Sequence, residues 1–273
     1  MSFVHTVAQG GFGSGTNELY DRARPSYQPK AIEHIRKALR GPGPYKIVEI
    51  GSGTGIFTRA LLSNPEWNKA IKGYVAVEPS EGMRDTFART IQDDRIHLRD
   101  GTFQNTGVED GWADLVVIAQ AYHWCPDFDL ASAEFARILA PNGTVACIWN
   151  LEDRHAARWV AGVRNTIEAH EQGSPQFRLF LWKQTFDTPS YKKFFEQPEE
   201  FIWSYSLVGT EQIVVDRACS KSYIAILPPD QKEEVCQKLR ELVRKGEDKE
   251  WIDEAAGTFH YPYQAWVVIW QKK

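Results

Sequence analysis

The feature that most constrains the fold is a short strand-like run that ends in alternating glycines and passes into a helical pattern. Its residues are Val48-Glu49-Ile50-Gly51-Ser52-Gly53-Thr54-Gly55. Glycines at the end of a strand permit a tight turn and let the backbone contact a ligand, because a Cβ would intrude there. The N-terminus of the following helix offers unpaired N–H groups to a carboxylate or phosphate. The run therefore predicts a ligand-binding loop between a strand and a helix, the alternative being a purely structural turn.

An acidic residue follows the next predicted strand. Residues 73–77 have the pattern of a strand, and Glu78 comes directly after them, 23 residues beyond Gly55. In open α/β folds a carboxylate at about this spacing accepts hydrogen bonds from ribose hydroxyls. The position after Gly55 is Ile56, so the loop lacks the spacing that a dinucleotide pyrophosphate requires. We therefore expect a nucleotide cofactor without a pyrophosphate.

Strands and helices alternate through the first 150 residues. A second glycine-rich stretch at 11–15 has no strand before it, so residues 1–16 are interpreted as a flexible N-terminus. Further predicted strands lie at 45–50, 96–98, 114–119 and 144–149, with helical patterns between them. This alternation favours a parallel α/β sheet with right-handed crossovers. We expect one domain over residues 1–273, with a cofactor-binding core at 17–150 and helical, substrate-covering additions at 151–200 and 209–258.

Composition excludes several classes of protein. The formal net charge is -4, without the basic patch that nucleic-acid binding requires. No apolar run approaches the length of a membrane span, and no signal pattern is present, so we expect a cytoplasmic protein with no membrane partner. The four cysteines show neither CxxC pairing nor a histidine at metal-binding spacing. They indicate reduced thiols and no metal site.

Several motifs together resemble the class I S-adenosylmethionine-dependent methyltransferases. Besides the glycine loop and Glu78, the matching stretches are Arg99-Asp100-Gly101-Thr102, Asp114-Leu115-Val116-Val117-Ile118-Ala119-Gln120-Ala121-Tyr122-His123-Trp124 and Arg137-Ile138-Leu139-Ala140-Pro141-Asn142-Gly143-Thr144. The resemblance is strongest to the branch that includes trans-aconitate and cantharidin methyltransferases, through residues 20–27 and 121–125. It covers residues 17–150 well and residues after 150 weakly.

This resemblance implies a Rossmann-like fold with a mostly parallel seven-stranded sheet, an antiparallel C-terminal strand and helical additions. It also implies that S-adenosyl-L-methionine is the cofactor and S-adenosyl-L-homocysteine the product. The cofactor contacts it implies are Tyr20, Arg24, Glu49, Gly51, Ser52, Gly53, Thr54, Gly55, Glu78, Pro79, Met83, Asp100, Gly101, Thr102, Gln120, Ala121 and Trp124.

Substrate and catalytic residues are expected at the same end of the sheet, where ligands bind in open α/β folds. We expect substrate contacts by Tyr27, His123, Trp149 and Trp159. His123 is a candidate general base because its ordinary pKa lies near neutrality, and Tyr20 is expected to line the path of the methyl group. The alternatives are that His123 bonds loop backbone and that the aromatic residues are core. Glu152 and Asp153 have no partner acid cluster, which favours a solvated helix start over a metal site.

The expected function is methyl transfer to an O, S or N atom of a small metabolite by in-line displacement, in a monomer or homodimer. Such a reaction needs a base only when the acceptor must lose a proton. One alternative is a cofactor-binding but non-methylating protein, such as a cyclase or regulatory subunit. A nicotinamide-dependent oxidoreductase is a further alternative, opposed by Ile56 and by the absence of a Tyr-x-x-x-Lys arrangement after residue 150.

Overall fold

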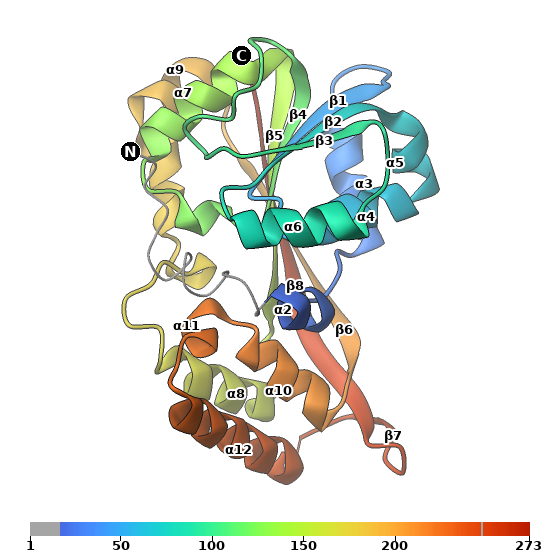
Figure 1. The fold of residues 1–273 in the computed structure, drawn as a ribbon, viewed down its shortest axis with the longest axis vertical. Helices are drawn as coiled ribbons and strands as arrows, with labels where there is room; N and C mark the ends of the chain where they lie inside the picture. Colours follow the sequence, from blue (N-terminus) through green and yellow to red (C-terminus); the bar gives the residue numbers. More distant parts are fainter. Residues whose placement is uncertain (1–16, 247) are drawn as a thin grey trace.

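The computed structural model describes residues 17–246 and 248–273, and within these residues eight strands form one sheet (Figure 1). The strand order is β3-β2-β1-β4-β5-β8-β6, with β7 paired to β8. The strands are β1 (Tyr45–Ile50), β2 (Ile71–Val77), β3 (Ile96–Arg99), β4 (Ala113–Ala119), β5 (Leu139–Glu152), β6 (Glu199–Gly209), β7 (Trp251–Asp253) and β8 (Thr258–Gln271). The first five in chain order pair in parallel, and β8 is antiparallel to its neighbours. This is the expected Rossmann-like, mostly parallel sheet with an antiparallel C-terminal strand, but it has eight strands where seven were expected, because the short strand β7 also pairs with β8. The predicted flexible N-terminus at 1–16 lies outside the described residues.

The helices connect these strands and extend beyond them. The α-helices are α2 (Asn17–Ala23), α3 (Pro29–Ala38), α4 (Ile56–Ser63), α5 (Pro65–Ala70), α6 (Glu81–Thr90), α7 (Phe128–Ile138), α8 (Arg158–Glu168), α9 (Pro189–Phe194), α10 (Glu211–Cys219), α11 (Ser222–Ala225) and α12 (Pro229–Lys245). Three 3₁₀ turns are η1 (Tyr122–Trp124), η2 (Phe177–Leu179) and η3 (Leu181–Asp187). Side-chain caps begin several of these helices; at α6 the Ser80 hydroxyl accepts the N–H of Met83.

Both faces of the sheet are buried, which explains the nearly continuous apolar runs of its central strands. In β1, Ile47 packs into the cluster formed with α3, α4 and α5. Its neighbours Val48 and Ile50 point to the opposite face, into the cluster formed with α7, η3 and α9. The two clusters hold the loop after β1 between rigid layers.

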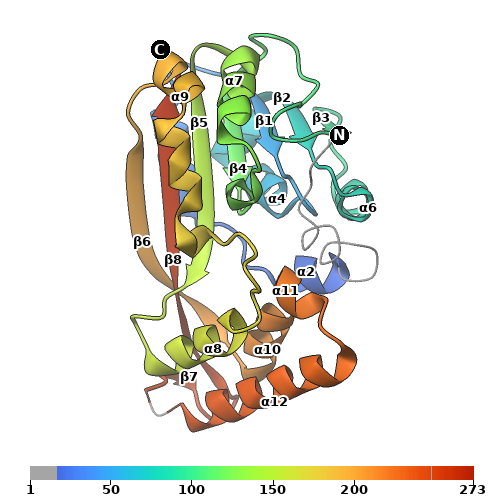
Figure 2. The ribbon, with the colours of Figure 1, turned by 90° about the vertical axis from the view of Figure 1, so that its left-hand side faces the viewer.

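A third hydrophobic cluster lies beyond the end of the sheet. It is formed by α8, α10, α11 and α12, which we call the cap, together with the near end of β8. Figures 1 and 2 show β8 running from the sheet down into the cap. Its residues Phe259 and Tyr261 pack in the cap cluster, whereas Val267 and Ile269 pack in a sheet cluster. One strand therefore contributes to both cores.

The two predicted helical additions, 151–200 and 209–258, pack against different parts of the molecule. Within 151–200, α8 joins the cap, but η3 and α9 pack against the face of the sheet, where Trp182 and Tyr191 are buried (Figure 2). Aromatic residues at helical spacing indicate a buried face without indicating which surface covers it. Helices α10, α11 and α12 of the second addition all belong to the cap.

Candidate active site

The glycine loop lies between β1 and α4, and each of its glycines has a positive φ. A Cβ on Gly51 would stand 2.6 Å from the Cβ of Ala121, and one on Gly55 would collide with Ile91 and Phe87. A Cβ on Gly53 would instead meet only the Sδ of Met83, at 3.5 Å. Gly51 and Gly55 are thus required by packing, whereas Gly53 leaves space beside the loop for a ligand.

Glu78 stands next to this open position. Its carboxylate accepts the N–H of Gly53 at 2.9 Å and the N–H of Ser80 at 2.8 Å. Burial raises the pKa of Glu78. The hydroxyl of Ser52 is buried and has no hydrogen-bond partner within the described part of the chain. The unpaired Ser52 hydroxyl, the open space at Gly53 and the Glu78 carboxylate fit the nucleoside of S-adenosylmethionine.

Asp100, Gly101 and Thr102, which were expected to contact the cofactor, follow β3 at the same edge of the sheet. Asp100 is exposed and pairs with Arg84 at 3.1 Å, and the same Arg84 nitrogen donates to the backbone carbonyl of Glu78. A Cβ on Gly101 would stand 2.7 Å from Val77, and the N–H of Thr102 bonds the carbonyl of Asn105. Arg84 thus ties the loop after β3 to the end of β2, next to Pro79.

Helix α2 docks on the glycine loop through a residue that the sequence analysis did not single out. The Thr54 hydroxyl donates to Asp21 at 2.6 Å, and Arg59 forms an ion pair with the same carboxylate. This contact brings Tyr20 to the pocket described below. The guanidinium of Arg24 lies 4.6 Å from the centre of the Tyr20 ring and donates to the carbonyl of Ser220 at 2.8 Å.

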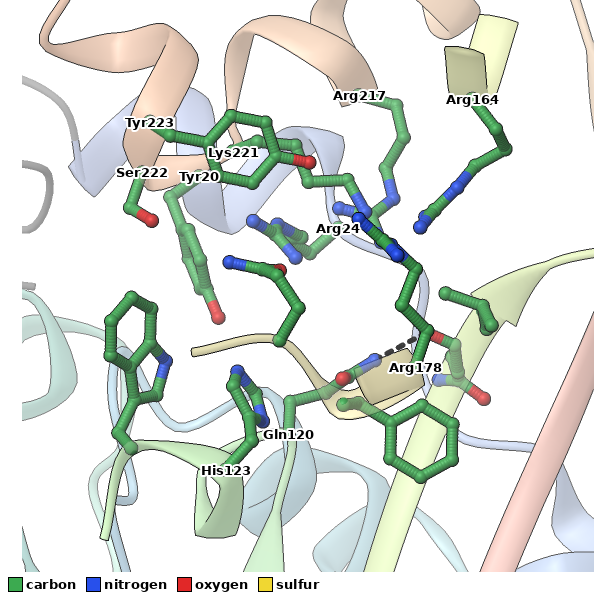
Figure 3. Close-up of a pocket in the computed structure, with 15 residues that line it drawn as sticks. Tyr20, Arg24, Gln120, His123, Arg164, Arg178, Arg217, Lys221, Ser222 and Tyr223 are labelled. Carbon is green, nitrogen blue, oxygen red and sulfur yellow. Dashed lines mark hydrogen bonds between the residues drawn. The ribbon is translucent and has the colours of Figure 1, made fainter. Parts of the chain in front are cut away.

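A pocket of about 550 Å³, partly open to solvent, lies between the carboxyl ends of the strands and the cap (Figure 3). It is lined by Tyr20, Arg24, Gln120, His123, Trp124, Asn150, Leu151, Arg164, Gln176, Phe177, Arg178, Arg217, Lys221, Ser222 and Tyr223. Gln120 has a positive φ, and its side chain donates to the carbonyl of Asn150 at 2.6 Å. The predicted residues that line this pocket are Tyr20, Arg24, Gln120, His123 and Trp124.

The pocket is strongly basic. Among the described residues that line it are five basic side chains and no carboxylate. Burial and the charge of Arg217 lower the pKa of Lys221 well below its ordinary value. Behind them, the buried carboxylate of Glu152 pairs with Arg164 at 2.7 Å, with Arg217 at 3.2 Å and with Lys221 at 3.2 Å. Although burial opposes it, the charges of these cations hold the pKa of Glu152 well below its usual range. Arg178 pairs with Glu168 and Glu171.

Arg24 is a buried arginine of the pocket lining that lies beside other cations. Burial and the nearby charge of Arg217 lower the pKa of Arg24 to about 10. Its Nε is buried without a hydrogen-bond partner among residues 17–246 and 248–273. A buried, incompletely bonded guanidinium that lines a pocket is suited to an anionic ligand.

His123 projects from η1 into the pocket. Its Nδ1 accepts the indole N–H of Trp149 at 3.3 Å. Burial, together with the charges of Arg24 and Lys221, lowers the pKa of His123 to about 3. The ring is therefore neutral at physiological pH, and the geometry gives no support to a general base acting through Nδ1.

Other predicted site residues lie away from the pocket. Tyr27 packs edge-on against Phe57 at 5.1 Å in a sheet cluster. Trp159 packs against Phe259 and Tyr261 in the cap cluster. Glu49 is buried within the sheet, where its carboxylate accepts the hydroxyls of Thr58 and Tyr74.

Trp149 does not line the pocket either; it lies behind His123. The described residues contain no group of side chains arranged to hold a metal ion. Within the same residues, no helix combines the length and the apolar character needed to cross a membrane.

The chain is similar to known methyltransferases over most of its length. Residues 48–147 match the family model of the methyltransferase domain. An uncharacterized methyltransferase of Mycobacterium tuberculosis is 28% identical over 232 residues, which is 85% of each chain.

Two solved structures share the fold. The YcgJ protein of Bacillus subtilis has a TM-score of 0.56 at 14% identity, covering 90% of this chain and 99% of that one. A phosphoethanolamine N-methyltransferase of Haemonchus contortus, solved with phosphomonomethylethanolamine and S-adenosylhomocysteine, has a TM-score of 0.57 at 13% identity, covering 100% of this chain and 60% of that one. The fold, the domain match over residues 48–147 and the relatives together make this chain similar to methyltransferases.

Proposed function

We propose that this chain transfers the methyl group of S-adenosylmethionine to an O, S or N atom of a small, anionic molecule by in-line displacement. The observation that carries the anionic acceptor is the lining of the pocket, which has five basic side chains and no carboxylate among the described residues. Basic groups in a site that is partly shielded from water attract an anion more strongly than they would in bulk water. The trans-aconitate and cantharidin branch and a cytoplasmic location remain part of this proposal.

The cofactor end is formed by the loop after β1 and by Glu78. S-adenosylmethionine supplies an activated methyl group on a positively charged sulfonium. Ser52 and Gly53 offer a hydroxyl and an open backbone surface, and Glu78 offers carboxylate oxygens to the ribose. The aromatic rings of Tyr20 and Trp124 line the adjoining pocket, where a π face favours a cation.

The acceptor end is formed by the cap together with Arg24, which directly follows α2. Arg24, Arg217 and Lys221 are placed to hold an anionic group, while Glu152 keeps the last two in position. Alignment of the reacting atoms and exclusion of water are the main contributions that such a displacement needs from the protein. A carboxylate or thiolate acceptor is already charged near neutral pH, so no base is required.

Calorimetric titration with S-adenosylhomocysteine, NADH and NADPH tests the cofactor. We expect micromolar binding of S-adenosylhomocysteine and no binding of either nicotinamide. Binding of a nicotinamide alone would favour the oxidoreductase alternative.

Transfer of labelled methyl groups tests the acceptor. The panel pairs small mono- and dicarboxylic acids and thiols with their neutral esters and thioethers, and we expect product only from the charged members. Lys221→Met should reduce this preference, whereas Lys238→Met should not, because the Lys238 side chain is 62% exposed. Cofactor binding without product from any member would favour the non-methylating alternative.

A further inference from the structure

The contact between Trp149 and His123 determines which nitrogen of the histidine carries the proton. The indole N–H can only donate a hydrogen bond, and it donates to Nδ1 of His123 at 3.3 Å. Nδ1 must therefore present its lone pair, so the proton of the neutral ring resides on Nε2. Figure 3 shows the ring of His123 pointing from its loop toward the pocket.

Trp149 is held rigidly in its place. It is fully buried on β5, opposite Trp266 of β8. Its ring stacks on Phe177 at 4.6 Å and lies 4.9 Å from Trp182. A donor fixed on both sides restricts the histidine far more than a donor on a mobile side chain would.

The charged groups around His123 also favour its neutral form. Arg24 from α2 and Lys221 from the turn before α11 are the charged groups that act on the ring. The other cations of the pocket lining are Arg164, Arg178 and Arg217, and the aromatic neighbour on the same turn is Trp124. Every one of these charges is positive, so each opposes a second proton on the ring.

We propose that Trp149 is a positioning residue that holds His123 as an Nε2–H donor to the anionic group of the acceptor. His123 then orients the acceptor beside the cationic groups and removes no proton from it. This inference rests on the proposed function for the identity of the anion. The tautomer of His123 itself does not depend on any ligand.

The first test is ¹⁵N NMR of the full chain labelled at histidine, with His123 assigned by loss of its signals in His123→Gln. We expect the Nε2–H tautomer, with no titration between about pH 6 and about pH 8. In Trp149→Phe the ratio of tautomers should shift about 5-fold toward Nδ1–H, since a hydrogen bond of about 1 kcal/mol is lost. An Nδ1–H tautomer in the unmodified chain, or titration near its ordinary pKa, would overturn the proposal.

Trp182→Phe is the matched control. Trp182 is equally buried and packs in the same aromatic cluster, but its N–H donates to the backbone carbonyl of Phe177 at 3.2 Å. We expect this variant to leave the tautomer of His123 unchanged. An equal shift in both variants would assign the effect to general loosening of the cluster and reject the role of Trp149.

The second test adds acetate to the complex with S-adenosylhomocysteine. Acetate should move the Nε2 resonance of His123 together with the guanidinium resonances of Arg24. Movement of Arg24 alone would overturn the donor role of His123 while leaving the anionic acceptor intact. If neither resonance moves, the anionic acceptor of the proposed function fails as well.

Discussion

Glu49 in the sheet and Glu152 at the edge of the cap are carboxylates of equal burial in opposite electrostatic surroundings. Glu49 is 1% exposed and accepts only the hydroxyls of Thr58 and Tyr74. Burial raises the pKa of Glu49 to about 7. Glu152 is 2% exposed and pairs with three cations, which hold its pKa well below the usual range.

The difference teaches that the two regions meeting at the pocket neutralise their buried charges differently. Within the described residues, the sheet region buries Glu49 and Glu78 without a neutralising cation in hydrogen-bond contact, whereas Glu152 at the cap contacts the three cations Arg164, Arg217 and Lys221. A positively charged cofactor and a negatively charged acceptor would each meet the complementary side. The following experiments test whether this division holds.

The largest expected effect is that of Glu152→Gln. The substitution leaves Arg164, Arg217 and Lys221 without their shared buried partner. Breaking a buried ion cluster by removing one member costs about 3–5 kcal/mol. Urea unfolding at neutral pH should therefore show a loss of this size, while Glu241→Gln, whose side chain is 69% exposed, should change little.

Glu152 should also make the unfolding free energy depend on pH. Because the folded pKa of Glu152 lies well below its ordinary value of 4.5, its stabilising contribution is present above that pH and is lost as pH falls through the folded pKa. The difference in unfolding free energy between the unmodified protein and Glu152→Gln should stay constant from about pH 8 to about pH 5 and shrink toward about pH 3. A difference that grew on acidification would contradict the ion cluster.

Glu49 should show the opposite dependence. Its pKa is raised from 4.5 to about 7, so between these values the folded protein binds more protons than the unfolded chain. The unfolding free energy should therefore fall by about 3 kcal/mol in total as pH rises through this window. Glu49→Gln should remove this slope in calorimetric unfolding, and Glu66→Gln, which is largely exposed, should keep it.

Glu78→Ala tests the cofactor end. Hydrogen bonds to a charged group contribute about 1.5–3 kcal/mol, so affinity for S-adenosylhomocysteine should fall about 10- to 100-fold. Asp100→Ala is the comparison at the same edge, and its effect should be smaller because that side chain is 75% exposed. Unchanged affinity in Glu78→Ala would reject the ribose role of this carboxylate.

The smallest effect is expected for Gly53→Ala. The positive φ costs about 1 kcal/mol of stability for alanine, but the nearest atom to the new Cβ is 3.5 Å away. Gly111→Ala carries the same backbone cost in open space, at a φ of +65°. Both variants should lose similar stability by urea unfolding, while only Gly53→Ala should weaken S-adenosylhomocysteine binding, by about 10-fold.

The sequence predicts the sheet region well because its signals are local. The run before the glycines predicts a strand at 45–50, and β1 has these bounds. The glycines of the turn and the first residues of the following helix are adjacent in the sequence. Glu78 follows them after one helix and one strand, at a spacing that the sequence also shows. The short elements α2, α5 and β7 were not predicted, because elements of so few residues are too short to show a clear hydrophobic periodicity.

The acceptor end could not be assembled in the same way, because its cations come from segments far apart in the chain. One usable signal was present: Arg164 lies on the same helical stripe as Val160, Val163 and Ile167. An arginine on an apolar stripe needs a buried partner or a cavity. Trp159 on the same helix was expected at the substrate, and its contacts lie in the cap cluster, because an aromatic side chain gives the same signal for either environment.

The passage of β8 through two cores has a consequence for how this chain can diversify. Because Phe259 and Val267 lie on one uninterrupted strand, the cap cannot be removed or exchanged as a cassette without cutting the sheet. Removal of α8 and of α10 to α12 would leave the near end of β8 projecting into water with the aromatic side chains of Phe259 and Tyr261 uncovered. We therefore expect changes of acceptor to require substitutions on α8, α10 and α11 rather than exchange of the whole cap.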